Sequence, residues 1–288
     1  MKVKVVTDSG GGITKKEADA LNIGFLPLQV IVNDKTYLDG VDLEIEELYD
    51  LIEKGYLPQT SMPPLGMIED MFEQYKEEGI TDVILITLSS GLSGTNEAVQ
   101  ASGKWHGVKV HTLDIYTTLG VQRYLALAAN KLVEKGYQPE RIIHRLQDAV
   151  DNSEGFLVCE DLNHLVRGGR LTPMAAKLAG MLKIKPILVV SKNTEGKVGL
   201  FDKVRTMSKA IKKACRQIEK GVKNPEDYHL IILDSNAKEN RDIAKEEYMN
   251  AFGPDVTISF EPIYAVIAAH TGLGAVGVQY IKKVKGAD

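Results

Sequence analysis

Short apolar runs alternate with amphipathic helical patterns through the first half of this 288-residue chain. The runs VKVVT and VILIT are each followed by residues with helical spacing, near positions 15–21 and from position 95 onward. Further helices are predicted near 45–54, 65–78 and 119–134. Alternating strands and helices predict an α/β layer fold with a mainly parallel sheet, because each helix returns the chain to the same end of the sheet.

The pattern changes around residues 151–155. Beyond this point lie six strand-like runs with fewer helices between them: GFLVC, KPILVV, KVGLF, HLIIL, VTISF and VQYIKKV. We therefore predict two α/β domains. Residues 1–153 form an N-terminal domain with a mainly parallel sheet and flanking helices, and residues 154–288 form a C-terminal domain with a mixed sheet and helices.

Composition excludes several classes of function. The net charge of −4 argues against nucleic acid as a partner. Cys159 and Cys215 form no disulfide or zinc spacing, and no H-E-x-x-H or EF-hand pattern occurs, so we expect no metal and no cofactor. No run has the length of a membrane span, and MKVKVVTDSG reads as a strand without the apolar segment of a signal peptide. We expect a cytoplasmic protein.

The stretch VILITLSSGLSGTNEA, residues 83–98, joins a predicted strand to a predicted helix through hydroxyl-bearing residues and glycines. This layout suits an anion, because N–H groups at a helix N-terminus are unsatisfied and carry partial positive charge. No lysine follows the glycines, so the turn is not the phosphate-binding loop of nucleotide hydrolases. GLSG also fails to match the G-x-S-x-G turn of serine hydrolases. Simple capping of the helix explains the serines equally well.

Four segments place small or polar residues at predicted strand ends: TDSGGGIT, TSMPP, SSGLSGT and AHTGLGAVG. Ligands of open α/β sheets bind at the carboxyl ends of the strands, where such loops converge. Thr60 and Ser61 precede a proline pair that could open a helix at Pro63 or Pro64. N-capping is again an equal alternative for each hydroxyl pair.

The last of these segments contains a literal G-x-G-x-x-G, formed by Gly272, Gly274 and Gly277. We do not expect a dinucleotide site, because the residues after Gly277 are too few to complete a βαβ unit and include no acidic residue about twenty positions on. The glycines instead favour close approach of the backbone to a ligand or to another segment. His270 stands in front of them, and both a structural and a functional role are open to it.

Two segments carry cations. RGGRLTP places Arg167 and Arg170 around a glycine pair, which is typical of a surface turn. A helical pattern from Met207 to Ile218 predicts one buried face and leaves a basic stripe outward: Lys209, Lys212, Lys213, Arg216 and Lys220. Such a stripe is usually a solvated face, but it can also attract an acidic partner or an anionic membrane surface.

Taken in order, seven segments resemble the DegV family of bacterial fatty-acid-binding proteins. They are TDSGGGIT, TSMPP, SSGLSGT, LVRGGRLT, KPIL, KVR and AHTGLGAVG, and they run from Thr7 to Gly277. One departure is Met62, where the family commonly has a polar residue after the Thr-Ser pair. The hydroxyls of Thr60 and Ser61 are unaffected by it.

The resemblance implies a bound long-chain fatty acid such as palmitate, stearate or oleate. Its acyl chain is implied to lie in the N-terminal domain, with the carboxylate near the interdomain cleft. The implied carboxylate donors are Thr60 or Ser61 together with Ser93, with Ser90 and His270 nearby. A carboxylate is well served by two or three hydroxyl or N–H donors, whereas a triphosphate would need lysine and a metal.

The resemblance also implies a partner. Several proteins of this family are the lipid-carrying subunit of a two-part fatty acid kinase, whose other subunit supplies the ATP chemistry. The chain would then be a carrier without catalysis of its own, and its catalytic residues would be none. Arg205, His270 and Arg170 are the positions implied to serve engagement with the kinase and phosphoryl transfer.

Two other functions compete with this one. The same broad fold group includes substrate subunits of dihydroxyacetone kinases, where a histidine holds a small carbonyl compound covalently. His270 would then be a nucleophile in a small, polar cavity. An interaction module that docks through the basic stripe is the third interpretation, and it leaves the hydroxyl loops without a role.

Overall fold

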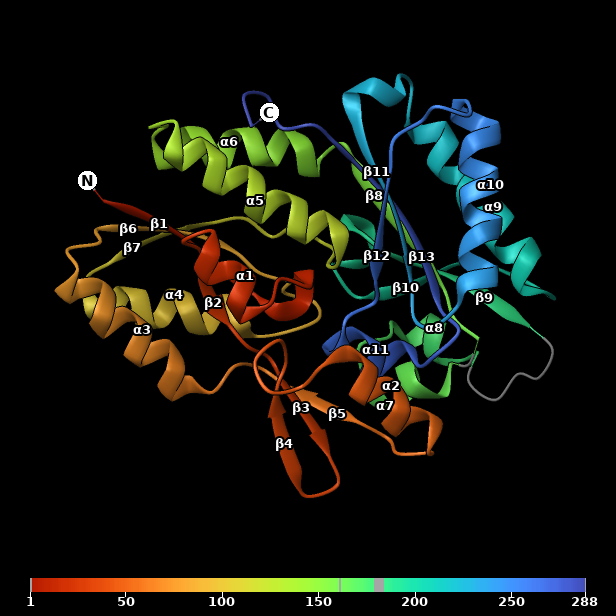
Figure 1. Cartoon of the computed structure of the whole chain (residues 1–288), viewed down its shortest axis with the longest axis horizontal. Helices are drawn as coiled ribbons and strands as arrows, with labels where there is room; N and C mark the ends of the chain where they lie inside the picture. Colours follow the sequence, from red (N-terminus) through yellow and green to blue (C-terminus); the bar gives the residue numbers. More distant parts are fainter. Residues whose placement is uncertain (1, 161, 179–183, 288) are drawn as a thin grey trace.

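The fold consists of two α/β halves, one built on a four-stranded sheet and the other on a six-stranded sheet (Figure 1). A computed structural model describes residues 2–160, 162–178 and 184–287. The predicted α/β class is confirmed.

The four-stranded sheet of the N-terminal half is entirely parallel, in the order β2-β1-β6-β7. Its strands are β1 (Val3–Asp8), β2 (Gly24–Leu26), β6 (Asp82–Ile86) and β7 (Lys109–Thr112). The central strand β6, DVILI, is buried at every position. Strands covered on both faces read as continuous apolar runs, which is why the sequence pattern revealed this sheet.

Helices cover both faces of the parallel sheet. They are α1 (Lys15–Ala20), α3 (Leu65–Glu77), α4 (Thr95–His106), α5 (Gly120–Glu134) and α6 (Pro139–Val150). On one face, Phe72 of α3 and Val99 of α4 pack in one cluster with Leu85. On the other face, Leu125 of α5 packs in a cluster with Ile86. Helix α3 begins directly after the proline pair, where a helix start was predicted.

A small antiparallel sheet in the N-terminal half was not predicted. It has the order β4-β3-β5 and consists of β3 (Gln29–Val32), β4 (Lys35–Leu38) and β5 (Gln59–Ser61), and helix α2 (Ile45–Glu53) lies between β4 and β5 in the chain. The apolar run GFLPLQVIV contributes to two strands, β2 and β3. Strand β5 has the sequence QTS, which carries no apolar pattern, so its sequence does not predict a strand.

The C-terminal half contains the predicted mixed sheet, and its strand order is β10-β9-β8-β13-β11-β12. Its strands are β8 (Ser153–Val158), β9 (Lys185–Val190), β10 (Val198–Val204), β11 (Tyr228–Asp234), β12 (Ile258–Pro262) and β13 (Val276–Lys282). All six predicted runs form strands. Their pairings are antiparallel except for that of β11 with β12.

The remaining helices belong to this half. They are α7 (Asn163–Gly168), α8 (Pro173–Ala176), α9 (Met207–Gly221), α10 (Lys238–Phe252) and α11 (Ala265–Thr271). Short 3-10 turns occur among the described residues at Ser9–Gly11, Lys192–Thr194 and Pro225–Asp227. Helices α9 and α10 cover the outer face of the mixed sheet. The predicted apolar face of α9 is buried, apart from the half-buried Met207. Lys212 and Lys213 of its basic stripe pair with Glu247 and Asp202, which partly neutralises the stripe.

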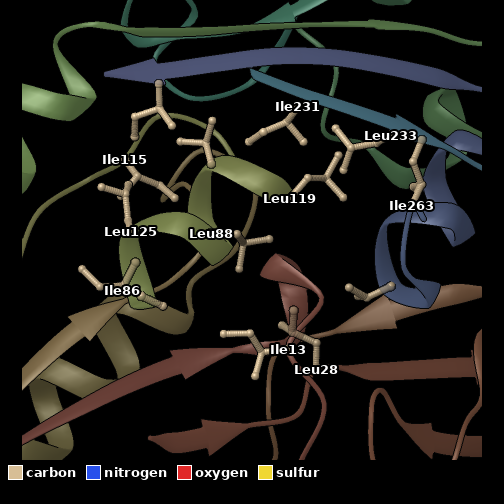
Figure 2. Packing of buried hydrophobic residues seen from close by; sticks show 14 of the residues in the cluster. Ile13, Leu28, Ile86, Leu88, Ile115, Leu119, Leu125, Ile231, Leu233 and Ile263 are labelled. Carbon is tan, nitrogen blue, oxygen red and sulfur yellow. The ribbon is translucent and has the colours of Figure 1, made fainter. Parts of the chain in front are cut away.

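One hydrophobic core joins the two halves (Figure 2). Ile115 and Leu119 from the N-terminal half meet Ile231 and Leu233, which lie on the inner face of the mixed sheet. The predicted domain boundary at residue 153 coincides with the start of β8, but the core crosses it without a break. We call this contact zone the seam.

Gln279 on β13 holds the seam with buried hydrogen bonds. Its Oε1 accepts from the N–H of Val121 at 3.2 Å, and its Nε2 donates to the carbonyl of Thr118 at 3.1 Å. Between these two positions Leu119 has a φ of 61°, which costs a leucine about 1–3 kcal/mol. The Gln279 amide therefore fixes a strained turn of one half from the sheet of the other.

A glycine at the seam provides a test of this packing. Gly12 has a φ of 73°, and a Cβ there would overlap the ring of Tyr264 from the other half. Gly79 has a φ of 70°, but a Cβ there would meet nothing within 4 Å. We expect Gly79→Ala to lower the free energy of unfolding by about 1 kcal/mol and Gly12→Ala by about 1–3 kcal/mol more. Urea unfolding measures both, and equal losses would show that the Gly12–Tyr264 contact does not hold the halves.

Candidate ligand-binding site

A cavity lies in the seam between the halves, with an empty volume of about 880 Å³ that includes space open to solvent. The N-terminal half contributes hydroxyls and apolar side chains: Thr60, Ser61, Ser93, Thr117 and Thr118, with Leu28, Met62, Leu88, Leu92 and Leu119. The C-terminal half contributes apolar side chains and a few polar or small residues: Phe156, Leu157, Leu165, Val190, Val198, Val266 and Ile267, with Gly155, Arg170, His270, Gly277 and Gln279. The cavity is apolar over most of its wall.

The position of this cavity differs from the implied one. The resemblance implies an acyl chain within the N-terminal domain, whereas the cavity is shared and takes more of its apolar wall from the C-terminal half. The physical reason is that both faces of the parallel sheet are already filled, by α3 and α4 on one side and by α5 on the other. Space remains where the two halves meet.

The loop after β6 brings Ser93 to the cavity. The N–H of Ser93 donates to the carbonyl of Ser89 at 3.2 Å, which folds the loop back on itself. Ser93 Oγ lies 2.8 Å from Thr95 Oγ1 and accepts from the N–H of Thr95 at 3.3 Å. Ser93 therefore accepts from the first N–H group of α4, whose N-cap is Gly94, and it also lines the cavity. Ser90 is exposed and is not among the lining residues.

The C-terminal half packs closely against this loop at two glycines. A Cβ at Gly91 would overlap the backbone of Glu195 and Gly196, in the hairpin between β9 and β10. A Cβ at Gly196, whose φ is 71°, would overlap Ser89 Oγ. The glycines let the two backbones touch, and the hairpin of one half thereby supports the hydroxyl loop of the other.

Thr60 and His270 meet at the same end of the cavity. Thr60 lies on β5, which pairs with β3, and His270 lies in the last turn of α11. Thr60 Oγ1 and His270 Nε2 are 2.7 Å apart. Ser61, which follows on β5, also lines the cavity. The segment AHTGLGAVG leads from α11 into β13, so the expectation that it follows the carboxyl end of a strand was wrong.

Arg170 lies in the cavity wall next to the Ser93 loop. Its Nε donates to the carbonyl of Leu92 at 3.2 Å, and Nη1 donates to the carbonyl of Gly168. The N–H of Val198 donates to the Arg170 carbonyl at 3.0 Å, which ties the segment to β10. The structure therefore brings together Thr60, Ser61, Ser93, Arg170 and His270, and we call these five residues the polar end of the cavity.

Arg205 and the segment TDSGGGIT lie elsewhere. Arg205 is exposed between β10 and α9 and does not line the cavity. In TDSGGGIT, the Asp8 carboxylate accepts from the N–H groups of Gly10 at 2.9 Å and Leu88 at 3.2 Å. Burial raises the pKa of Asp8 to about 6. Asp8 thus shapes the cavity indirectly, by fixing Leu88.

The polar end of the cavity is partly exposed to solvent. All five of its residues are half-buried. In contrast, Thr117, Thr118 and Gln279 are buried, with exposed fractions of 7%, 6% and 5%. Sequence reasoning missed these three residues and the glycine Gly155, because nothing in the strand patterns distinguishes a cavity wall from a core.

Within the described parts of the chain, no helix has the length and apolarity needed to cross a membrane. Over those same residues, no three His, Cys, Asp or Glu side chains are grouped in a way that could hold a metal ion.

Fold and cavity together define a two-part α/β protein with an apolar cavity that is polar at one end. A family model described as DegV, "Uncharacterised protein, DegV family", matches residues 2–283. The chain belongs to the DegV family.

Relatives cover almost the whole chain. Protein DegV of Bacillus subtilis (strain 168) is 32% identical over 282 residues, which is 96% of this chain and 98% of that protein. A DegV domain-containing protein of Staphylococcus aureus (strain N315) is 30% identical over 98% of both chains. Among solved structures, a fatty acid binding DegV family protein from Streptococcus agalactiae is 29% identical, with a TM-score of 0.88 over 98% of this chain and 99% of that one. DegV from Bacillus subtilis, a fatty acid binding protein, gives 30% identity and a TM-score of 0.86 over 98% and 100%.

The protonation of His270 can be predicted for the ligand-free protein. Burial lowers the pKa of His270 to about 4, and the charges of Arg170 and His164 lower it further in the same direction. An unfolded histidine titrates near 6.5. Between these values the unfolded chain binds a proton that the folded chain does not, so the free energy of unfolding falls as the pH is lowered.

We expect delipidated wild-type protein to lose about 2 kcal/mol more than His270→Asn between pH 7 and pH 5. Comparing the two proteins cancels the titration of other groups such as Asp8. Urea unfolding at both pH values measures the difference, and the imidazole resonances of His270 should show no titration in this range. A His270 midpoint near 6.5, with no difference in stability, would contradict the buried neutral ring.

Proposed function

We propose that this protein binds a long-chain fatty acid, with the acyl chain in the seam cavity and the carboxylate at its polar end. Thr60 or Ser61 donates to the carboxylate together with Ser93. The observation that carries the proposal is the cavity itself, whose wall is mostly apolar and whose polar end combines half-buried hydroxyls with a cation. Two solved relatives that are fatty acid binding proteins support it.

Affinity and orientation come from different parts of this site. Burying about fourteen methylenes at ~0.8 kcal/mol each supplies roughly 11 kcal/mol of gross driving force. A hydrogen bond to a charged group contributes about 1.5–3 kcal/mol. The apolar wall therefore holds the ligand, and the hydroxyls decide which end of it faces outward.

Arg170 and His270 complete the polar end in different ways. Arg170 provides a permanent positive charge in the wall beside Ser93, which favours a carboxylate over a neutral head group. The neutral His270 ring holds the Thr60 hydroxyl at 2.7 Å and so positions a donor. A carboxylate bound here would stabilise the protonated ring and raise the pKa of His270.

We further propose that the chain presents the carboxylate to a separate kinase subunit that forms an acyl phosphate with ATP. The half-buried polar end leaves the carboxylate close to the surface, where a second protein can reach it. Arg205 is exposed, and its planar donor fork suits a phosphate group. This role places the protein in the cytoplasm, where ATP is available. Brief contact of the protein with an anionic membrane stays a prediction. The exposed cations of α9 that could make this contact are Lys209, Arg216 and Lys220.

The cavity favours this function over the covalent alternative. A small carbonyl compound held on His270 calls for a small, polar site, whereas apolar residues outnumber polar ones in this cavity. An interaction module that acts through α9 would leave the cavity without a role.

Ser93 and Ser90 form a matched pair for testing carboxylate recognition. Ser93 lines the cavity, whereas Ser90 is exposed outside it on the same loop. We expect Ser93→Ala to weaken palmitate binding by roughly ten- to a hundredfold, because one hydrogen bond to a charged group is lost. Ser90→Ala should bind like wild type. Fluorescence competition or calorimetry on delipidated protein measures both.

Two results would contradict this assignment. Equal palmitate affinity for Ser93→Ala and wild type would remove Ser93 from the carboxylate site. Much tighter binding of the alcohol of equal chain length than of the acid would refute an anion site at the polar end.

A variant of Arg205 can test lipid binding and phosphorylation of the lipid by the kinase separately. Because Arg205 is exposed and away from the cavity, we expect Arg205→Ala to bind palmitate as tightly as wild type. Charge builds on the γ-phosphate oxygens during transfer, and a positioned cation stabilises it. With a cognate kinase subunit and Mg-ATP, Arg205→Ala should therefore lose most acyl-phosphate formation.

Lys203→Ala is the control, since it removes an exposed cation from the preceding strand. It should retain acyl-phosphate formation. Full acyl-phosphate formation by Arg205→Ala, with a kinase that uses the wild-type protein, would refute the proposed role of Arg205. Loss of palmitate binding would instead place Arg205 in the lipid site.

A further inference from the structure

Two contacts between a histidine and a glycine join α7 to α11. A Cβ at Gly168, the last residue of α7, would overlap Nδ1 and Cε1 of His270 in the last turn of α11. A Cβ at Gly272, directly after α11, would overlap the ring of His164 in α7. Each histidine ring therefore lies against the backbone of a glycine at the end of the other helix, and no side chain fits between them.

The ring of His270 is held on two sides. Its Nδ1 edge lies against Gly168, and its Nε2 lies 2.7 Å from Thr60 Oγ1 on β5. The backbone at Gly168 is itself fixed, because Arg170 Nη1 donates to its carbonyl and the N–H of Val198 donates to the Arg170 carbonyl at 3.0 Å. A side chain at position 168 would therefore have to displace the ring, and the ring could not keep its present contact with Thr60.

The contact between Thr60 and His270 has a direction if Thr60 binds the ligand. A threonine hydroxyl carries one proton, so Thr60 can donate to a carboxylate only while it accepts from His270. Burial keeps His270 neutral by lowering its pKa to about 4, and a neutral ring carries its proton on only one nitrogen. That nitrogen must be Nε2, so that the Nε2–H donates to Thr60 Oγ1 and leaves the Thr60 proton free for the carboxylate.

We propose that Gly168 is a positioning residue of the carboxylate site: it lets His270 reach Thr60, and His270 then orients the Thr60 hydroxyl toward the ligand. This inference rests on the proposed fatty acid function and selects Thr60 over Ser61 as the donor on β5. It also gives a role to the glycine pair of RGGRLTP. Gly169 is exposed and ends α7 with a φ of 68°, which makes the turn, whereas Gly168 is helical and half-buried against His270.

The first test compares two ligands that differ only in their head group. We expect Gly168→Ala to weaken palmitate binding by roughly tenfold or more, because the displaced ring no longer orients the Thr60 hydroxyl. Hexadecanol has the same chain length and no charge, and it should lose less affinity. The preference for the acid over the alcohol should therefore fall about five- to tenfold. Fluorescence competition on delipidated protein measures both affinities.

Gly66→Ala is the matched control. Gly66 is also a helical glycine, in α3, but a Cβ there would meet nothing within 4 Å. This variant should bind both ligands like wild type. An unchanged preference for the acid in Gly168→Ala would overturn the inference.

A double variant shows whether Gly168 acts through His270. Removal of the imidazole makes room for a Cβ at position 168, so Gly168→Ala combined with His270→Ala should bind palmitate as weakly as His270→Ala alone. Losses that multiply in the double variant would overturn the inference, because Gly168→Ala would then act on another part of the site.

The position of the proton on His270 gives a test on the wild-type protein itself. In ligand-free protein with nitrogen-labelled histidine, NMR should show the proton of the neutral ring on Nε2 and none on Nδ1. A proton on Nδ1 would overturn the inference, since Thr60 would then have to donate to the ring. Wild-type protein that binds neither palmitate nor hexadecanol would instead refute the proposed function, so the two failures are distinguishable.

Discussion

The structure depends on burial of the inner face of the six-stranded sheet against the N-terminal half. Ile231 and Leu233 on that face pack with Leu119 and Ile115 in one core that belongs to neither half alone. Apolar area removed from water is the main favourable term in such a contact, so separation of the halves would expose the largest buried cluster. The contact leaves a cavity, and Gly155 and Gly277 of the sheet are among its lining residues. The proposed binding site is thus a gap in this interface.

The proposed recognition requires both halves to be in register. The hydroxyls of Thr60 and Ser93 come from one half, and Arg170 and His270 come from the other. The 2.7 Å contact between Thr60 and His270 crosses the seam, as do the Gln279 hydrogen bonds to the strained turn at Leu119. A ligand bound by all of these groups would add stability to the interface, since a ligand that binds the folded state alone stabilises it.

The sequence predicted the elements with strong periodicity and missed those whose identity depends on neighbours. The continuous run in β6 and the six runs of the C-terminal half were identified, because burial on one or both faces leaves a pattern in the chain itself. Strand β5 carries Thr60 but has no apolar pattern, and it exists because its backbone pairs with β3. Ser93 and His270 stood out as polar residues among glycines. Gln279 and Gly155 did not, because their role arises from the register of β13 against β8.

The central claim, that the cavity holds a long-chain fatty acid without a covalent bond, is tested most directly by mass spectrometry of the purified protein. The protein is measured intact and denatured, and its organic extract is analysed in parallel. We predict a long-chain fatty acid in the extract, in amounts that approach one per protein, and an unmodified polypeptide mass. An adduct on His270 would contradict the account in favour of a covalently held substrate. An empty extract, followed by failure of the delipidated protein to bind added palmitate, would contradict it outright.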